Sequence, residues 1–215
     1  MELLHFLLDF VLHLDRHLVE LLARFDLWLY AILFVVIFAE TGLVVTPFLP
    51  GDSLLFGAGA LASIDAGGRL SPWWLTVAMT GAAVLGNTTN YTLGRVIGRR
   101  AFSGRHRFIK VEYLQRTEGW FARHGAATVL LSRFAPIVRT FAPFVAGVGR
   151  MPLARFQAWN VAGALAWVAL FVWGGYFVGN LPLVRDNFGL VTITVILVSL
   201  LPLATMLLRR PRVAE

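Results

Sequence analysis

The first 26 residues place polar side chains with the spacing of an α-helix. Leu and Phe fill most other positions, and polar residues recur every three or four places, at His5, Asp9, His13, Arg16, His17, Glu20 and Arg24. A single polar stripe on an apolar helix is typical of a helix at a membrane surface, so we predict an amphipathic interfacial helix over residues 1–26. His13 and His17 could instead share a metal ion. No other ligand cluster lies nearby, which favours a solvated stripe.

The next apolar segment is interrupted in its middle. Residues 27–45 are apolar except for Glu40, and a short apolar arm follows at 53–63. Between the two arms stand the helix-breaking residues Pro47, Pro50 and Gly51. The second arm is too short to cross a hydrocarbon core of about 30 Å. We therefore predict a re-entrant hairpin over about 27–63, which enters and leaves the membrane on one side.

Residues 126–149 repeat this pattern, with an apolar arm, two arginines and a second arm of small residues. The polar and helix-breaking positions are Arg133, Pro136, Arg139 and Pro143. We interpret the segment as a second re-entrant hairpin and as a weak internal repeat of the first. Ordinary transmembrane helices are predicted over about 72–94, 156–178 and 190–208, and Trp73 and Trp74 mark the interface at the start of the first.

Composition supports a membrane protein. Of the 215 residues, 58% are apolar and 14% are charged, and the mean hydropathy is +0.72. Soluble domains carry about 45–50% apolar and about 25% charged residues, so an ordinary soluble enzyme is excluded. The chain has no cysteine, which excludes disulfides, thiolate metal sites and cysteine nucleophiles.

The net charge of +7 is unevenly distributed. Basic residues concentrate in the loop 95–125 and in the tail 209–215. The positive-inside rule places both in the cytoplasm, and the chain shows no motif of nucleic-acid recognition. Counting crossings outward from that loop makes the two hairpins enter from opposite faces. The expected fold is an all-α integral membrane protein with an inverted repeat, as in secondary transporters, whose membrane domain covers 27–208.

Four charges lie within the predicted hairpins: Glu40 and Asp52 in the first, Arg133 and Arg139 in the second. Each costs about 2.5–3.5 kcal/mol at the bilayer centre, so the acids and the arginines are expected to compensate one another. One interpretation is a structural ion-pair cluster. The other is a transport site, because a guanidinium matches a phosphate and a poorly hydrated carboxylate can load and release a proton.

At these residues the chain resembles the DedA family, also called the VTT or SNARE-associated Golgi protein domain. The resemblance covers nearly the whole chain. It rests on Glu40-Thr41-Gly42, on Pro47-Phe48-Leu49-Pro50-Gly51-Asp52-Ser53, on Asn90-Tyr91-Thr92-Leu93-Gly94-Arg95, and on the segment from Arg133 to Pro143.

The resemblance implies a lipid transporter of the bacterial inner membrane that moves undecaprenyl phosphate, or phospholipids such as phosphatidylethanolamine, with the proton-motive force. It assigns phosphate binding to Arg133 and Arg139, and proton coupling to Glu40 and Asp52. The family often has Gly-Asp where this chain has Gly86-Asn87, so any proton step here proceeds without that aspartate.

Further residues at the inner end of the 72–94 helix are candidates for supporting roles. They are Asn90, Tyr91 and Arg95, although Tyr91 also suits an interfacial aromatic belt and Arg95 a topology anchor. The pairs Gly94/Gly98 and Gly175/Gly179 have the spacing of close helix packing.

The leading hypothesis is a flippase for a phosphate-headed lipid, with membrane lipids and protons as partners and no cofactor or metal. The alternatives are a phospholipid scramblase, a lipid phosphatase using Ser132 beside Arg133, and a structural membrane protein. A phosphatase needs a positioned base, and the nearest histidine, His124, lies in the polar loop, so we do not expect an enzyme. The sequence leaves homo-oligomer formation open.

Overall fold

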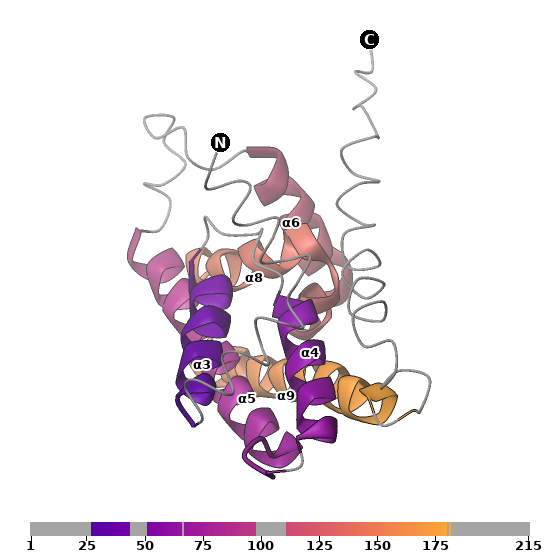
Figure 1. Cartoon of the computed structure of the whole chain (residues 1–215). Helices are drawn as coiled ribbons and strands as arrows, with labels where there is room; N and C mark the ends of the chain where they lie inside the picture. The colour runs from indigo at the N-terminus through magenta and orange to yellow at the C-terminus, as the bar shows by residue number, and fades with distance from the viewer. Residues whose placement is uncertain (1–26, 44–50, 66, 98–110, 180, 182–215) are drawn as a thin grey trace, which may run out of the picture. The chain divides into compact units, whose positions relative to one another are not determined.

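The computed structural model describes residues 27–43, 51–65, 67–97, 111–179 and 181, and the secondary structure within these ranges is helical, with no strand (Figure 1). This agrees with the predicted all-α class. Several predictions fall outside the described residues: the N-terminal helix 1–26, the breaks at Pro47 and Pro50, part of the basic loop, the crossing 190–208 and the tail 209–215.

The described helices form two compact units. The α4 unit contains α4 (Gly51–Ile64), the loop that follows it, and α9 (Leu153–Gly179) from Phe171 onward. The α5 unit contains α3 (Trp28–Gly42) from Tyr30 and α5 (Pro72–Ile97) from Trp73. It also contains α6 (Val111–His124), the short segments that follow α6, α8 (Pro136–Val148), and α9 up to Leu170.

Glycines allow the two helices of the α4 unit to pack closely. A side chain at Gly59 would overlap the carbonyl of Val172, and one at Gly175 would overlap the carbonyl of Phe56. A side chain at Gly179 would likewise overlap α4. The Gly175/Gly179 pair therefore serves close helix packing, as its spacing predicts.

Asp65 organises the loop between α4 and α5. Its carboxylate accepts hydrogen bonds from the backbone N–H groups of Gly67 (3.2 Å), Arg69 (2.7 Å) and Leu70 (3.1 Å), and an ion pair from the Arg69 guanidinium (3.2 Å). Burial raises the pKa of Asp65, but the hydrogen bonds from Leu70, Arg69 and Gly67 lower it by more, so the net pKa is below its usual value. The ionised side chain thus holds the turn closed.

The longest helices coincide in extent with two predicted crossings, and one of the two is apolar enough to span a bilayer. Among the described residues one helix, α9, is both long and apolar enough to span a bilayer; its 27 residues include the predicted span 156–178. The 26-residue helix α5 includes the predicted span 72–94 but carries more polar residues in its second half. Trp73 and Trp74 at its start are 69% and 68% exposed, as expected for aromatic residues at a membrane interface.

The predicted basic loop 95–125 is wrong in its extent. Residues 95–97 still belong to α5, and Val111–His124 form the helix α6, which lies beside α8 (Figure 1). The segment is amphipathic: Thr117 is fully buried, whereas Glu118 and Arg123 face outward. Charge content alone suggested a loop, but a helix with one polar face accommodates the same charges.

The second predicted hairpin has its break at one of the two expected prolines. Short turns Gly125–Ala127, Thr128–Leu131 and Ser132–Phe134 form the first arm, the backbone becomes extended at Ala135, and α8 begins at Pro136. The proline ring clashes with the residue before it when that residue is helical, so Pro136 disfavours a helical conformation at Ala135. This explains the break. The break predicted at Pro143 is wrong: Pro143 lies inside α8, which continues to Val148. In the first hairpin, Gly51 begins α4 as expected.

Candidate functional site

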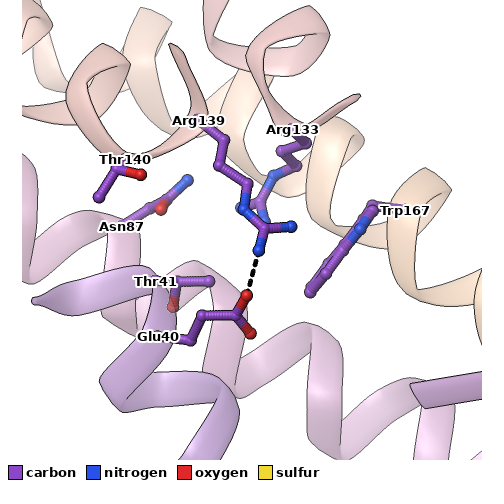
Figure 2. Close-up of a pocket in the computed structure, with 7 residues that line it drawn as sticks. All are labelled: Glu40, Thr41, Asn87, Arg133, Arg139, Thr140 and Trp167. Atoms are coloured by element: carbon purple, nitrogen blue, oxygen red, sulfur yellow. Dashed lines mark hydrogen bonds and ion pairs between the residues drawn. The ribbon is translucent and has the colours of Figure 1, made fainter. Parts of the chain in front are cut away.

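Side chains from five elements of the α5 unit, most of them charged or polar, surround one buried pocket. Its lining residues are Glu40 and Thr41 of α3, Asn87 of α5, Arg133 of the Ser132–Phe134 turn, Arg139 and Thr140 of α8, and Trp167 of α9 (Figure 2). The cavity has a volume of about 20 Å³, which accommodates about one water molecule. In this conformation it is too small for a phosphate group.

Glu40 and Arg139 form an ion pair across the pocket. The Nη2 atom of Arg139 donates to Oε1 of Glu40, as the dashed line in Figure 2 shows. The side chain of Glu40 is 2% exposed and that of Arg139 is 18% exposed, so the pair is largely removed from solvent. The prediction that an acid of the first hairpin compensates an arginine of the second is confirmed for these two residues.

Arg133 is held by neutral groups. Its Nη2 donates to Oδ1 of Asn160 at 2.8 Å and to the carbonyl of Ala83 at 3.4 Å. The residue is 5% exposed, and within the described part of the chain its Nε has no hydrogen-bond partner. The guanidinium carbon lies 5.8 Å from the ring centre of Trp167, and that of Arg139 lies 5.9 Å from the same ring. One indole therefore faces both cations.

Asn160 connects Arg133 to a line of amides between α5 and α9. Its Oδ1 also accepts from Nδ2 of Asn87 at 3.1 Å. Its own Nδ2 donates to the carbonyl of Val84 and to Oε1 of Gln157, each at 3.1 Å. Gln157 in turn donates to Oγ1 of Thr88 at 2.8 Å. The network thus extends from Arg133 and Asn87 at the pocket to the half-buried side chains of Gln157 and Thr88.

Asn90 contacts the backbone next to both ion-paired residues. This fully buried residue donates through Nδ2 to the carbonyl of Thr140 at 2.9 Å and, more weakly, to that of Thr41 at 3.5 Å. Thr41 follows Glu40 in sequence and Thr140 follows Arg139. Asn90 therefore ties α5 to the two backbone positions next to the ion-paired residues, although it does not line the cavity.

Tyr91 and Arg95 form a separate cluster. The Tyr91 hydroxyl donates to the carbonyl of Met151, its ring stacks on Phe156 at 4.4 Å between centres, and Arg95 donates to that hydroxyl at 3.4 Å. Tyr91 is 1% exposed, so the interpretation as an interfacial belt residue is wrong. Neither residue lines the pocket. These contacts fasten the end of α5 to the turn between α8 and α9.

The structure brings together three of the four predicted charged residues. The fourth, Asp52, lies in the first turn of α4, which belongs to the α4 unit. Sequence reasoning missed Trp167 and Asn160 altogether, and noted Asn87 only as a departure from the family. A signal for Asn160 was available, because Gln157 and Asn160 are polar residues one turn apart within a predicted crossing.

Known proteins resemble this chain over most or all of its length. Residues 49–177 match the VTT domain. The protein DedA of Escherichia coli K12 is 51% identical over 215 residues, which is all of this chain and 98% of that protein. The inner membrane protein YghB of the same organism is 35% identical over 181 residues, 83% of this chain and 78% of its own length.

A third relative comes from another organism. An uncharacterized membrane protein of Mycobacterium leprae is 39% identical over 169 residues, 78% of this chain and 74% of that protein. No solved structure matches the chain.

The helical structure of the described residues, their apolar helices and the membrane proteins among these relatives define a helical membrane protein. The chain belongs to the DedA family of VTT-domain proteins. Relatives named as inner membrane proteins support a location in the bacterial inner membrane.

Proposed function

We propose that this protein is a flippase that carries a phosphate-headed lipid, undecaprenyl phosphate, across the bacterial inner membrane with the proton-motive force. The observation that supports it best is the buried pocket at which Arg133 and Arg139 meet. Guanidinium groups bind phosphate through paired, charge-assisted hydrogen bonds. Two arginines in one largely dehydrated pocket of a membrane protein suit the headgroup of an anionic lipid.

The proposal requires the pocket to open, because the cavity of about 20 Å³ does not admit a phosphate. In this structure the guanidinium of Arg139 is paired with the carboxylate of Glu40. Protonation of Glu40 would remove its attraction for Arg139, and the headgroup oxygens would take the place of the carboxylate. Deprotonation would then expel the headgroup. Proton movement and lipid movement are thereby coupled at one residue, and we assign Asp52 of α4 a second proton-accepting role.

The predicted membrane arrangement remains part of this proposal. The pocket draws Glu40 from the segment of the first hairpin and both arginines from that of the second. If the hairpins are re-entrant from opposite faces, as we propose, each can expose the pocket to one side of the membrane in turn.

We propose no covalent step. The Ser132 hydroxyl donates to the carbonyl of Val129 at 3.1 Å and is not among the residues that line the cavity, so within the described part of the chain no base is positioned to activate it as a nucleophile.

The test is transport of labelled undecaprenyl phosphate by the purified protein in liposomes. Arg133→Ala and Arg139→Ala are expected to abolish transport, whereas Arg155→Ala, which removes an exposed arginine of α9, is expected to retain it. Unchanged transport in both pocket variants would refute the assignment of the arginines. Transport of phosphatidylethanolamine that ignores a proton gradient would instead favour a phospholipid scramblase.

A further inference from the structure

The two arginines of the pocket differ in their ionic contacts. Arg139 forms an ion pair with Glu40, whereas Arg133 forms no ion pair within the described residues. Glu40 lies against Arg139, whereas the hydrogen-bond partners of Arg133 within the described residues are an amide oxygen and a backbone carbonyl. A buried cation without a counter-ion is costly, so this arrangement calls for a reason.

The hydrogen bonds of Asn160 fix which of its ends faces Arg133. The carbonyl of Val84 can only accept, so the group that contacts it must be the amide NH₂ of Asn160. The amide oxygen then points to Arg133 and Asn87, both of which donate to it. The side chain of Asn160 thus makes four hydrogen bonds, one to Arg133 and three to other residues at the α5–α9 interface. These bonds fix its orientation, so Asn160 presents a rigid, neutral acceptor to Arg133.

We propose that Asn160 is a positioning residue that holds Arg133 in place without neutralising it, so that Arg133 keeps its positive charge for an anion. This inference rests on the proposed function and adds an order of events. Arg133, whose Nε has no partner within the described residues, receives the anionic headgroup first. Arg139 joins only after Glu40 withdraws.

A purely structural role for Asn160, as polar contact between α5 and α9, makes a different prediction. Asn160→Asp keeps the shape of the side chain and an oxygen that accepts from Arg133 and Asn87, but it supplies a carboxylate as counter-ion. A structural role predicts a lower unfolding midpoint for Asn160→Asp, because its second oxygen cannot donate to the carbonyl of Val84 or to Oε1 of Gln157, but it predicts unchanged anion binding by the protein that remains folded. A requirement for uncompensated charge on Arg133 predicts weaker anion binding by the folded protein.

The matched control is Gln157→Glu. It makes the same exchange of an amide for a carboxylate in the same network, but Gln157 lies one helical turn away and contacts Asn160 rather than Arg133. A second variant tests the charge balance directly. Glu40→Gln combined with Asn160→Asp restores the charge of the parent pocket, with the carboxylate beside Arg133 instead of beside Arg139.

The experiment measures equilibrium binding of undecaprenyl phosphate to the purified full-length chain in detergent, with the thermal unfolding midpoint as a folding control. Asn160→Asp is expected to weaken binding at least about tenfold, as for loss of one charge-assisted interaction. Gln157→Glu is expected to change it at most about threefold, and the double variant to return it to within about threefold of the parent.

Wild-type affinity in folded Asn160→Asp, equal losses in Asn160→Asp and Gln157→Glu, or no recovery in the folded double variant would each overturn the inference. Inorganic phosphate serves as a second probe. If the parent binds phosphate with the expected ranking of variants but does not transport the lipid, the proposed function fails and this inference stands. If the parent transports the lipid but the variants do not follow the expected ranking of affinities, only this inference is refuted. If the parent binds neither undecaprenyl phosphate nor inorganic phosphate, both this inference and the proposed function are refuted.

Discussion

The two pocket arginines, identical in type, have different electrostatic environments. Arg139 faces the carboxylate of Glu40, whereas Arg133 faces the amide oxygen of Asn160 and a backbone carbonyl. Removing one partner of a buried ion pair leaves the other uncompensated and costs about 3–5 kcal/mol. A single substitution at Glu40 or Arg139 therefore alters stability and any transport chemistry together, and a reciprocal exchange is needed to separate them.

Exchanging the two partners tests whether the pair acts only in folding. Glu40→Arg and Arg139→Glu are each expected to lower the free energy of unfolding by about 3–5 kcal/mol, because each leaves like charges facing one another in a buried site. The double variant restores opposite charges and is expected to recover most of that stability in thermal unfolding. Lipid transport in liposomes is expected to stay absent, since the carboxylate then lies on the helix that should present an arginine. Full recovery of transport would identify the charges as structural.

At the scale of elements, glycines set how closely α3, α5 and α8 approach one another. A Cβ atom at Gly42 would lie 3.3 Å from the Cα of Gly86, and one at Gly94 would overlap the carbonyl of Phe144. The predicted packing role of Gly94 is thereby confirmed. These contacts matter for the pocket because Glu40 and Arg139 meet only when α3 and α8 both lie close to α5.

Gly86 and Gly81 of α5 offer a matched pair for testing this packing. A Cβ at Gly86 would overlap Oγ1 of Thr41 and lie 2.9 Å from the carbonyl of Phe38, whereas at Gly81 its nearest neighbour is a ring atom of Phe34 at 3.9 Å. Gly86→Ala is expected to destabilise the protein by about 1–3 kcal/mol and to weaken lipid transport, because α3 must move away. Gly81→Ala is expected to be neutral or to stabilise by about 0.5–1 kcal/mol. Equal unfolding midpoints for the two variants would contradict the close approach of α3 and α5.

At the scale of the whole molecule, the distribution of basic residues predicts its orientation. The region from Arg95 to Arg123 carries eight basic and two acidic residues, and such segments stay on the cytoplasmic side. If α5 crosses the membrane once, as predicted, we expect the loop that Asp65 organises to face the periplasm. The finding that part of the basic region is the helix α6 leaves this argument unchanged, because the rule counts charges and not conformation.

The absence of cysteine makes the orientation directly testable. Gly67→Cys and Ala122→Cys each place one thiol at an exposed position, in the loop after α4 and in α6 respectively. A membrane-impermeant thiol reagent is expected to label Gly67→Cys in intact spheroplasts and Ala122→Cys only after permeabilisation. The parent chain, with no thiol, provides the background. The reverse labelling pattern would overturn the predicted orientation.

Local features of the sequence were sufficient to predict the environment, the helical class, the break at Pro136, the family and the four charged residues in the predicted hairpins. Apolar length, proline chemistry and charge are properties of short segments and need no knowledge of distant contacts. Charge content without periodicity misassigned α6, and a single proline inside a helix was mistaken for its end.

Only the tertiary structure decided which charges meet and what else surrounds them. Glu40 and Arg139 are 99 positions apart, and Arg133 and Asn160 are 27 apart, so their pairing depends on the side on which each helix presents its residues. The burial of Tyr91 and the place of Trp167 beside two arginines have the same origin. The sequence determines which charged and polar side chains need a partner within a membrane, whereas helix packing determines which partner each side chain contacts.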